Sequence, residues 1–191
     1  MAAYGKAPGE LRLVQDFVNT VDLEDAEEGL ASPDALRDWL AERDLVDGAA
    51  AISAGDLERG LAVREALREL MRANNDGRLE ARAVDGLNRA AAAASLQVRF
   101  DRDGRARLLA AAGGWDGALG RLLAIVERAM SDGSWSRLKA CRADTCRWAF
   151  YDRSRNRSGS WCNMEVCGNR SKARAYRARQ RRRPGAQAAM P

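Results

Sequence analysis

The 191-residue chain contains no histidine. This absence removes the most common general base, the usual pH-sensitive side chain and the most frequent zinc ligand. No nucleophile–base pair, phosphate-binding loop or cofactor fingerprint is found either, so we expect a protein that is not an enzyme. The residues that come nearest to a catalytic cluster are Asp16, Asn19 and Asp22 on the first expected helix. Such polar groups more often form a solvated face or a domain contact.

The chain also lacks a long apolar run. Apolar residues make up 46% of the sequence, which suffices for a core, but no run approaches the roughly 20 residues of a membrane helix. The N-terminal stretch MAAYGKAPGELRL has no charged segment followed by an apolar one, so no signal peptide is expected. We therefore expect a cytoplasmic protein with no membrane partner, whose thiols stay reduced.

Acidic residues are scarce near the C-terminus. Residues 137–183 contain 15 Lys and Arg but only three carboxylates, whereas the first 136 residues contain 17 basic and 24 acidic groups. The net charges of +12 and −7 predict two functional units. The predicted parts are an α-rich sensor or regulatory domain (1–135), a cysteine module (136–183) and a flexible tail (184–191).

Most of the chain has helical periodicity. Ser32 before Pro33, and Ser53 or Asp56 before the next apolar stripe, are typical helix starts. The stretch LQVRFDRDGRARLLA alternates around Asp103-Gly104, which predicts a β-hairpin. The expected fold class is mainly α with a small β-hairpin, a helical N-terminal domain that has room for a small-molecule ligand, and a four-cysteine zinc module ending in a basic helix. The expected helices span about 10–22, 33–44, 57–71, 79–94 and 115–130.

All four cysteines lie in one segment, as two pairs with four residues inside each pair and fifteen between the pairs. Two short pairs around a polar loop are typical of structural zinc, which accepts four thiolates in a tetrahedron. The loop is too polar to form its own core, so the metal would supply the folding energy. The predicted ligands are Cys141, Cys146, Cys162 and Cys167.

Three alternatives to zinc stay open. Two disulfides would need an oxidising compartment, for which there is no signal. A dithiol redox site usually has two residues between its cysteines, and an iron–sulfur cluster usually has tighter or asymmetric spacing. If zinc binds, Arg142, Arg147 and the backbone amides after Cys146 and Cys167 are expected to offset the surplus thiolate charge, and a redox-sensing role is a secondary hypothesis.

A strongly basic helix is expected after the last cysteine. Four arginines at positions 170, 174, 177 and 181 share one helical face, and alanines between the cations permit close approach to a surface. Such a helix suits a phosphate backbone, because lysine and arginine give affinity without much sequence choice. The aromatics Trp148, Phe150, Tyr151 and Trp161 are expected to form the small core of the module. The predicted nucleic-acid contacts are Arg170, Lys172, Arg174, Arg177, Arg179 and Arg181, with a second stripe that continues to Arg183.

The stretches CRADTC and WCNMEVCGNRSKARAYRAR resemble the CGNR zinc finger family, and LVQDFVNTVD near the N-terminus is similar to the start of the ABATE domain of bacterial stress-induced transcription regulators. The resemblance covers about Leu11 to Arg183. It implies a zinc-binding, DNA-binding regulator whose metal ligands are the four cysteines. Within the motif, Gly168 is expected at a tight turn leaving the site and Asn169 at the cap of the basic helix, while Arg170 braces the metal turn or touches phosphate.

The leading hypothesis is a two-domain regulator in which the N-terminal domain senses or dimerises and the module binds duplex DNA. An RNA- or ribosome-associated protein would use the same basic helix. A third hypothesis is a protein-interaction module, including one in which the basic module docks on the acidic domain of its own chain and inhibits itself.

Overall fold

The computed structural model describes residues 5–75, 77 and 79–181. The basic residue Arg183 and the predicted tail 184–191 lie outside the described residues. The six α-helices of the described part are α1 (Leu11–Val18), α2 (Pro33–Ala41), α3 (Ala54–Ala73), α4 (Ala81–Ala93), α5 (Gly114–Ser131) and α6 (Asn169–Arg181). None of its helices is long and apolar enough to cross a membrane.

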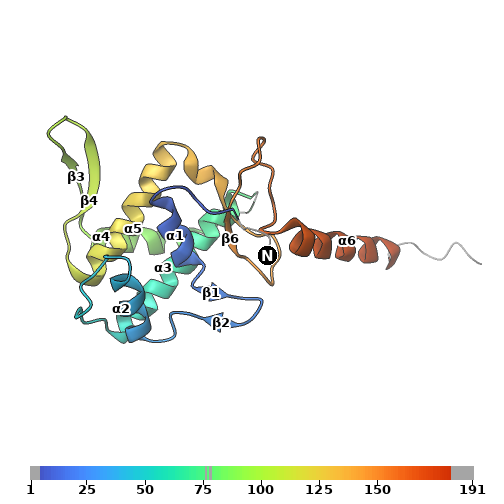
Figure 1. Ribbon diagram of the computed structural model, residues 1–191, viewed down its shortest axis with the longest axis horizontal. Coiled ribbons are helices and arrows are strands. Elements are labelled where there is room, and N and C mark those ends of the chain that lie inside the picture. Colours follow the sequence, from blue (N-terminus) through green and yellow to red (C-terminus); the bar gives the residue numbers. More distant parts are fainter. Residues whose placement is uncertain (1–4, 76, 78, 182–191) are drawn as a thin grey trace, which may run out of the picture.

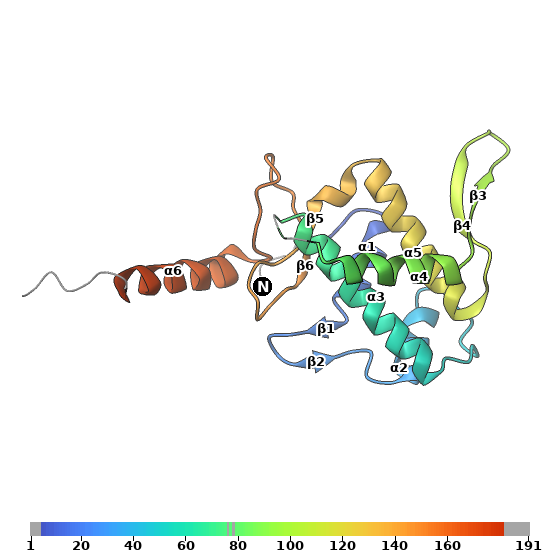
Figure 2. The same ribbon diagram turned by 180° about the vertical axis from the view of Figure 1, so that it is seen from behind.

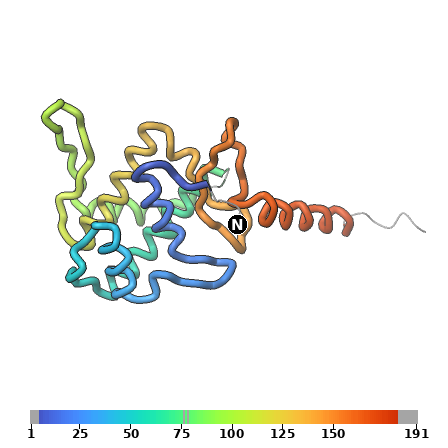
Figure 3. The backbone as a smooth tube through the Cα atoms, viewed as in Figure 1, coloured from blue at the N-terminus to red at the C-terminus, as the bar shows by residue number. Residues whose placement is uncertain are grey.

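Three antiparallel strand pairs complete the described fold, which confirms the mainly α class. The predicted hairpin is β3–β4, and the other two pairs are short. Figures 1 and 3 show β3–β4 projecting at one end of the long axis and α6 at the other, with the packed helices between them. The strands are β1 (Val21–Asp22), β2 (Glu27–Glu28), β3 (Leu96–Phe100), β4 (Ala106–Ala110), β5 (Leu138–Ala140) and β6 (Ala149–Tyr151).

The helix starts read from the sequence are confirmed. The Ser32 side chain accepts a hydrogen bond from the Ala35 amide at 3.1 Å, with Pro33 in the first turn of α2. At α3, Ser53 and Asp56 form a reciprocal capping box, so both predicted candidates take part. Both caps satisfy amide groups that a helix leaves without an internal partner.

The first helix is shorter than predicted, because it ends at Val18 instead of continuing to residue 22. The reason is a competing turn: the Asp22 carboxylate accepts the amides of Glu24 and Asp25 at 2.8 and 3.3 Å, which directs the chain into the β1–β2 pair. Short acidic side chains compete in this way with helical hydrogen bonding. The resulting acidic hairpin is held to α3 by the buried Arg64, which donates to both carboxylate oxygens of Glu28 at 2.7 Å.

One hydrophobic core extends through both predicted parts of the chain. Phe17 of α1, Leu67 of α3 and Leu122 of α5 are almost fully buried in it. Leu138 of β5 and Ala149 of β6, from the cysteine module, belong to the same cluster. The change of charge near residue 136 is therefore not matched by a break in the core.

Candidate metal centre and basic helix

The structure brings the four cysteines together. Their sulfur atoms all lie within 4.8 Å of one another, and all four thiols are free. The Cys146 and Cys162 sulfurs are 3.5 Å apart, and those of Cys162 and Cys167 are 3.8 Å apart. These separations are too long for disulfides, which need about 2.05 Å.

A tetrahedral zinc ion fits these sulfurs. Zinc–sulfur bonds of about 2.3 Å in a tetrahedron imply sulfur–sulfur edges of about 3.8 Å. The observed separations lie close to that value, and thiolate sulfur is a preferred zinc ligand. Cys141, Cys146, Cys162 and Cys167 are the residues that would hold the ion, and with four protein ligands the site is of the closed, structural type.

Crowding makes four simultaneous negative charges unfavourable without a cation. The pKa of Cys141 is lowered to about 2, because the thiols of Cys146 and Cys162 donate to its sulfur. Cys141 in turn raises the pKa of Cys146 to about 12 and raises that of Cys162, while burial raises the pKa of Cys167. A divalent ion removes this conflict, since a coordinating thiol is deprotonated outright.

The first cysteine pair lies on a turn between β5 and β6. The Cys141 amide donates to the Trp148 carbonyl at 2.9 Å, and the amides of Cys146 and Arg147 donate to the Ala143 carbonyl at 2.9 and 3.0 Å. Arg147 has a left-handed backbone with φ of 51°, which reverses the chain into β6. The turn thereby directs both sulfurs of the pair to the same side.

The second pair is held by a helical turn that the sequence did not predict. The segment η2 (Met164–Gly168) is a π-helix, and the Asn163 side chain accepts from the amides of Glu165 and Val166 at its start. The prediction that Asn169 caps the basic helix is wrong, and the cap is Asn163. The reason is that η2 runs directly into α6, which leaves no free helix start at Asn169. The predicted turn at Gly168 is likewise wrong: Gly168 is helical, and a Cβ there would lie 2.4 Å from the Met164 sulfur.

The donors around the thiols agree with the prediction for a backbone amide after Cys146 and differ from it for the two arginines. The backbone amides of Ala143 and Cys162 point at the Cys141 sulfur, and that of Trp148 points at Cys146. Arg142 donates instead to the Asn75 carbonyl at 2.5 and 2.9 Å, and Arg147 forms an ion pair with Glu69 of α3. Both guanidinium groups thus connect the module to the end of α3.

The aromatics act as predicted in two cases. Trp148 and Trp161 pack against the cysteine cluster, so they form the small core of the module. Phe150 is buried, whereas Tyr151 packs on the main core.

Asparagine side chains position the module; the contact of Asn19 was one of the two interpretations expected from the sequence, whereas those of Asn74 and Asn75 were missed. Asn19 accepts the Ala149 amide and donates to its carbonyl, at 2.8 and 2.9 Å, which makes it a domain contact. Asn74 binds the carbonyls of Trp135 and Leu138, and Asn75 binds those of Ala140 and Ser160. The pair Asn74-Asn75 was recognised only as a helix stop, because nothing local reveals that its side chains satisfy carbonyls more than 60 residues away.

Arg68 of α3 braces the same contact from a fully buried position. Its guanidinium donates to the Val18 carbonyl at 2.6 Å and to the Arg147 carbonyl at 3.2 Å, and it pairs with Glu65 at 3.1 Å. Burial lowers the pKa of Arg68, and the adjacent Glu65 opposes that effect.

Replacing Arg68 by methionine should lower the free energy of unfolding by about 2 kcal/mol, because the buried Val18 carbonyl and the partly buried Arg147 carbonyl lose this donor, and Glu65 keeps only Arg64 as a cation partner. Urea denaturation of the zinc-loaded protein measures the loss. Arg59→Met is the matched control, since Arg59 makes a comparable i,i+3 pair in an exposed position. Equal stability of the two variants would contradict the bracing role.

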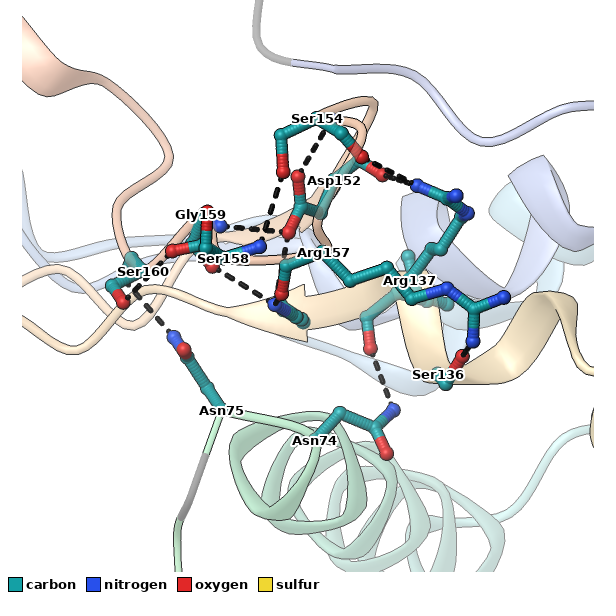
Figure 4. Close-up of polar contacts among 12 residues, drawn as sticks. Asn74, Asn75, Ser136, Arg137, Asp152, Ser154, Arg157, Ser158, Gly159 and Ser160 are labelled. Atoms are coloured by element: carbon teal, nitrogen blue, oxygen red, sulfur yellow. Dashed lines mark hydrogen bonds and ion pairs between the residues drawn. The ribbon is translucent and has the colours of Figure 1, made fainter.

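The loop between β6 and Cys162 is organised by a buried carboxylate (Figure 4). Asp152 accepts from the amides of Ser154 and Gly159 at 2.9 and 2.8 Å, and from the Lys139 ammonium at 2.9 Å. Burial by itself would raise the pKa of Asp152, but hydrogen bonds from Ser154, Lys139 and Gly159 lower it to about 2. The same ammonium also binds the carbonyls of Arg157 and Gly159, so the loop has little freedom.

The Asp152 network predicts a pH-dependent contribution to stability. Because the pKa of Asp152 is about 2 in the fold and about 3.9 in an unfolded chain, its contribution is fully present above pH ~4 and is lost as the pH falls toward 2. The contribution is about 2 to 3 kcal/mol. The stability difference between wild type and Asp152→Asn should be constant from pH 7 to 5 and shrink below that; a difference that grows on acidification would contradict the assignment.

Helix α6 carries the predicted cations on an exposed surface. It has no buried residue and no acidic residue, and it extends away from the rest of the molecule (Figure 1). Arg170 pairs with Glu24 of the acidic hairpin. Lys172, Arg174, Arg177, Arg179 and Arg181 have no carboxylate partner within the part of the chain that the structure describes.

Two family models match the chain on either side of the change in charge. Residues 137–180 match the CGNR zinc finger, and residues 11–132 match the ABATE model, described as "Putative stress-induced transcription regulator". The chain belongs to the ABATE family and has a CGNR zinc finger. The sulfur cluster is the metal site of that finger, and zinc is its cofactor. A search of the curated proteins finds no match.

Proposed function

We propose that this ABATE–CGNR protein is a DNA-binding transcription regulator linked to stress, and not an enzyme. Zinc holds the two cysteine pairs together, and α6 continues from the second pair as an exposed cationic arm. The regulator family of the N-terminal domain supports this proposal. The polar side chains that come nearest to a catalytic group in the sequence make structural contacts instead: Asp16 pairs with Arg12, and Asn19 binds the Ala149 backbone.

The observation that carries the proposal is the unpaired charge of α6. Five cations on one exposed helix lack a carboxylate partner among the described residues, and the helix itself contains no acidic residue. Unpaired cations on a protruding surface favour a polyanionic partner, and helical spacing places several of them along one line of phosphates. Base-edge contacts would have to come from other side chains of the arm, for which Gln180 is a candidate.

The test is a titration of duplex DNA with the zinc-loaded protein at several salt concentrations. Counterion release predicts a log–log slope of about −0.9 for each phosphate contacted, so five contacts give a slope near −4 to −5. Affinity that does not change with salt would contradict the proposal. Competition with structured RNA distinguishes a DNA-binding protein from an RNA-associated one. Displacement of the duplex by RNA at equal concentration would favour the RNA-associated protein.

A self-inhibiting form receives limited support from the Arg170–Glu24 pair. Only this first cation of α6 contacts the acidic hairpin, and the cations further along the helix extend beyond it. We therefore propose that α6 is open to nucleic acid in the full chain. A Glu24→Gln variant should bind duplex DNA no more than a fewfold more tightly, since an exposed ion pair contributes little.

A further inference from the structure

The loop 153–158 is a second basic element of the metal module. It lies between β6 and the second cysteine pair, and every one of its residues is exposed. It contains three arginines and no carboxylate, and the preceding Asp152 is buried and paired with Lys139. Figures 1 and 2 show this loop at the same end of the molecule as α6. Two separate cationic elements therefore leave the metal module at that end.

The tip of the loop is a tight turn. The Arg157 amide donates to the Ser154 carbonyl at 3.3 Å, so Arg155 and Asn156 are the two central residues of a β-turn. The Ser154 hydroxyl also accepts from the Ser158 amide at 3.1 Å. Hydrogen bonds within the loop thus fix the backbone of its tip.

Buried charge fixes the base of the loop (Figure 4). Lys139 and Asp152 are only 3% and 4% exposed, and their ion pair holds the loop backbone on both sides of the tip. No hydrogen bond of this network involves the side chain of Arg155 or Asn156. The fold therefore orders the backbone of the tip without using its two central side chains.

The three arginines of the loop differ in what they bind. Arg153 donates to a backbone carbonyl of the N-terminal segment at 2.9 Å, and Arg157 donates to the Ser136 hydroxyl at 2.9 Å. Both guanidinium groups thus bind the body of the protein. Arg155 and Asn156 have no hydrogen-bond or ion-pair partner among the described residues. The two uncommitted side chains are adjacent, and both lie at the tip.

Arginine and asparagine match the exposed edges of purine bases. Arginine can donate two hydrogen bonds to O6 and N7 of guanine, and asparagine can pair with N6 and N7 of adenine. We propose that the turn at 154–157 reads base sequence in the major groove of duplex DNA, with Arg155 contacting guanine and Asn156 contacting adenine. This inference rests on the proposed DNA-binding function, in which α6 supplies the contacts to phosphate.

The ordered tip favours base contacts over a further contact to phosphate. Attraction to phosphate carries no sequence information and tolerates a mobile cation, whereas a base-edge hydrogen bond needs a donor in a fixed position. An ordered backbone also reduces the conformational entropy that is lost on binding. The major groove, about 12 Å wide, admits an α-helix, and a two-residue turn is narrower. Within α6 the candidate Gln180 donates to the Tyr176 hydroxyl at 3.0 Å, whereas the tip side chains are uncommitted.

The test is selection of short duplexes from a randomised library by the full, zinc-loaded chain. The affinity of each variant is then measured for the enriched duplex and for an unrelated duplex of equal length. Wild type should enrich a sequence with a defined guanine and a defined adenine. Arg155→Ala should reduce the preference for the enriched duplex by roughly 5- to 150-fold and relax the choice at the guanine. Asn156→Ala should do the same at the adenine.

Two control variants separate base readout from charge and from the loop as a whole. Arg174→Ala, on α6, removes one cation that is assigned to phosphate, so it should weaken binding to both duplexes equally and reduce the salt slope by about 1. Ser158→Ala, an exposed position outside the centre of the turn, should leave the preference unchanged. Zinc content and thermal unfolding show whether each variant is folded.

The possible failures are distinguishable from one another. If wild type binds every duplex with equal affinity, base readout by the loop is overturned and the phosphate contacts of α6 stand. If the preference survives in both Arg155→Ala and Asn156→Ala, another element reads the bases and the proposal is overturned. If the chain binds no duplex at any salt concentration, this inference and the proposed function fail together.

Discussion

Replacing Cys146 by serine should release zinc and unfold the outer half of the metal module. Even partners outside the ligand shell change metal affinity 10- to 100-fold, so loss of a thiolate should weaken zinc binding by more than about 100-fold. Structural zinc contributes about 10–16 kcal/mol to folding in isolated fingers. Zinc content per chain, measured by elemental analysis before and after dialysis against a weak chelator, gives the result directly.

The unfolding should be uneven, because the two cysteine pairs have different support. Leu138, Ala140 and Ala149, in the strands that flank the first pair, belong to the main core and stay packed without metal. The second pair and α6 have only the small cluster around the sulfurs, since α6 buries nothing. Hydrogen exchange of the metal-free protein should therefore accelerate over residues 160–181 while β5 and β6 stay protected.

The matched control for this experiment is Thr145→Ser, an exposed position in the same turn. That variant should retain one zinc per chain and the exchange pattern of wild type. Full zinc content in Cys146→Ser, or exchange that accelerates equally through both pairs and the strands, would contradict the structural role assigned to the metal.

Removing three cations from α6 should weaken binding to duplex DNA by two to three orders of magnitude. At 0.1 M salt, loss of three phosphate contacts lowers the association constant by roughly 500-fold and reduces the steepness of the log–log salt dependence by about 3. The variant Arg174→Ala/Arg177→Ala/Arg181→Ala tests this, because alanine preserves the helix while it removes the charge. Anisotropy titrations of labelled duplex at several salt concentrations give both quantities.

The control variant removes the same charge elsewhere on the molecule. Arg89, Arg102 and Arg105 are exposed on α4 and at the turn of the hairpin, far from α6 along the chain and in Figure 1. Their replacement by alanine should change the affinity by only a fewfold, through the net charge. If both triple variants lose affinity equally, the interaction is an unspecific effect of total charge and α6 is not the contact surface.

Local signals in the sequence were reliable where one short segment contains all the determinants. The capping box at Ser53 and the Ser32-Pro33 start depend on neighbouring residues alone, and both are confirmed. The hairpin around Asp103-Gly104 is confirmed for the same reason, since Asp101 accepts the turn amides of Asp103 and Arg105. The cysteine spacing likewise indicated a common metal site before any contact was known.

Predictions failed at one helix start, for a local reason, and at two arginines that have distant partners. Asn169 was expected to cap α6, but the π-helical turn at Met164–Gly168 makes α6 a continuation, with Asn163 as the cap. Arg142 and Arg147 were expected at the thiolates and instead bind the end of α3, because Asn75 and Glu69 lie there. Such contacts join residues about 70 or more positions apart, which no local pattern encodes.

By itself, the sequence determined the ligand chemistry of the metal site, the helical class of the fold and the concentration of positive charge at one end. These properties follow from residue type and short spacing, which act before the chain folds. Only the tertiary structure decided that the metal module shares the core of the N-terminal domain, held there by Asn19, Arg68, Asn74 and Asn75. The reason is physical: buried backbone carbonyls must find donors wherever packing brings them, and packing is a property of the whole chain.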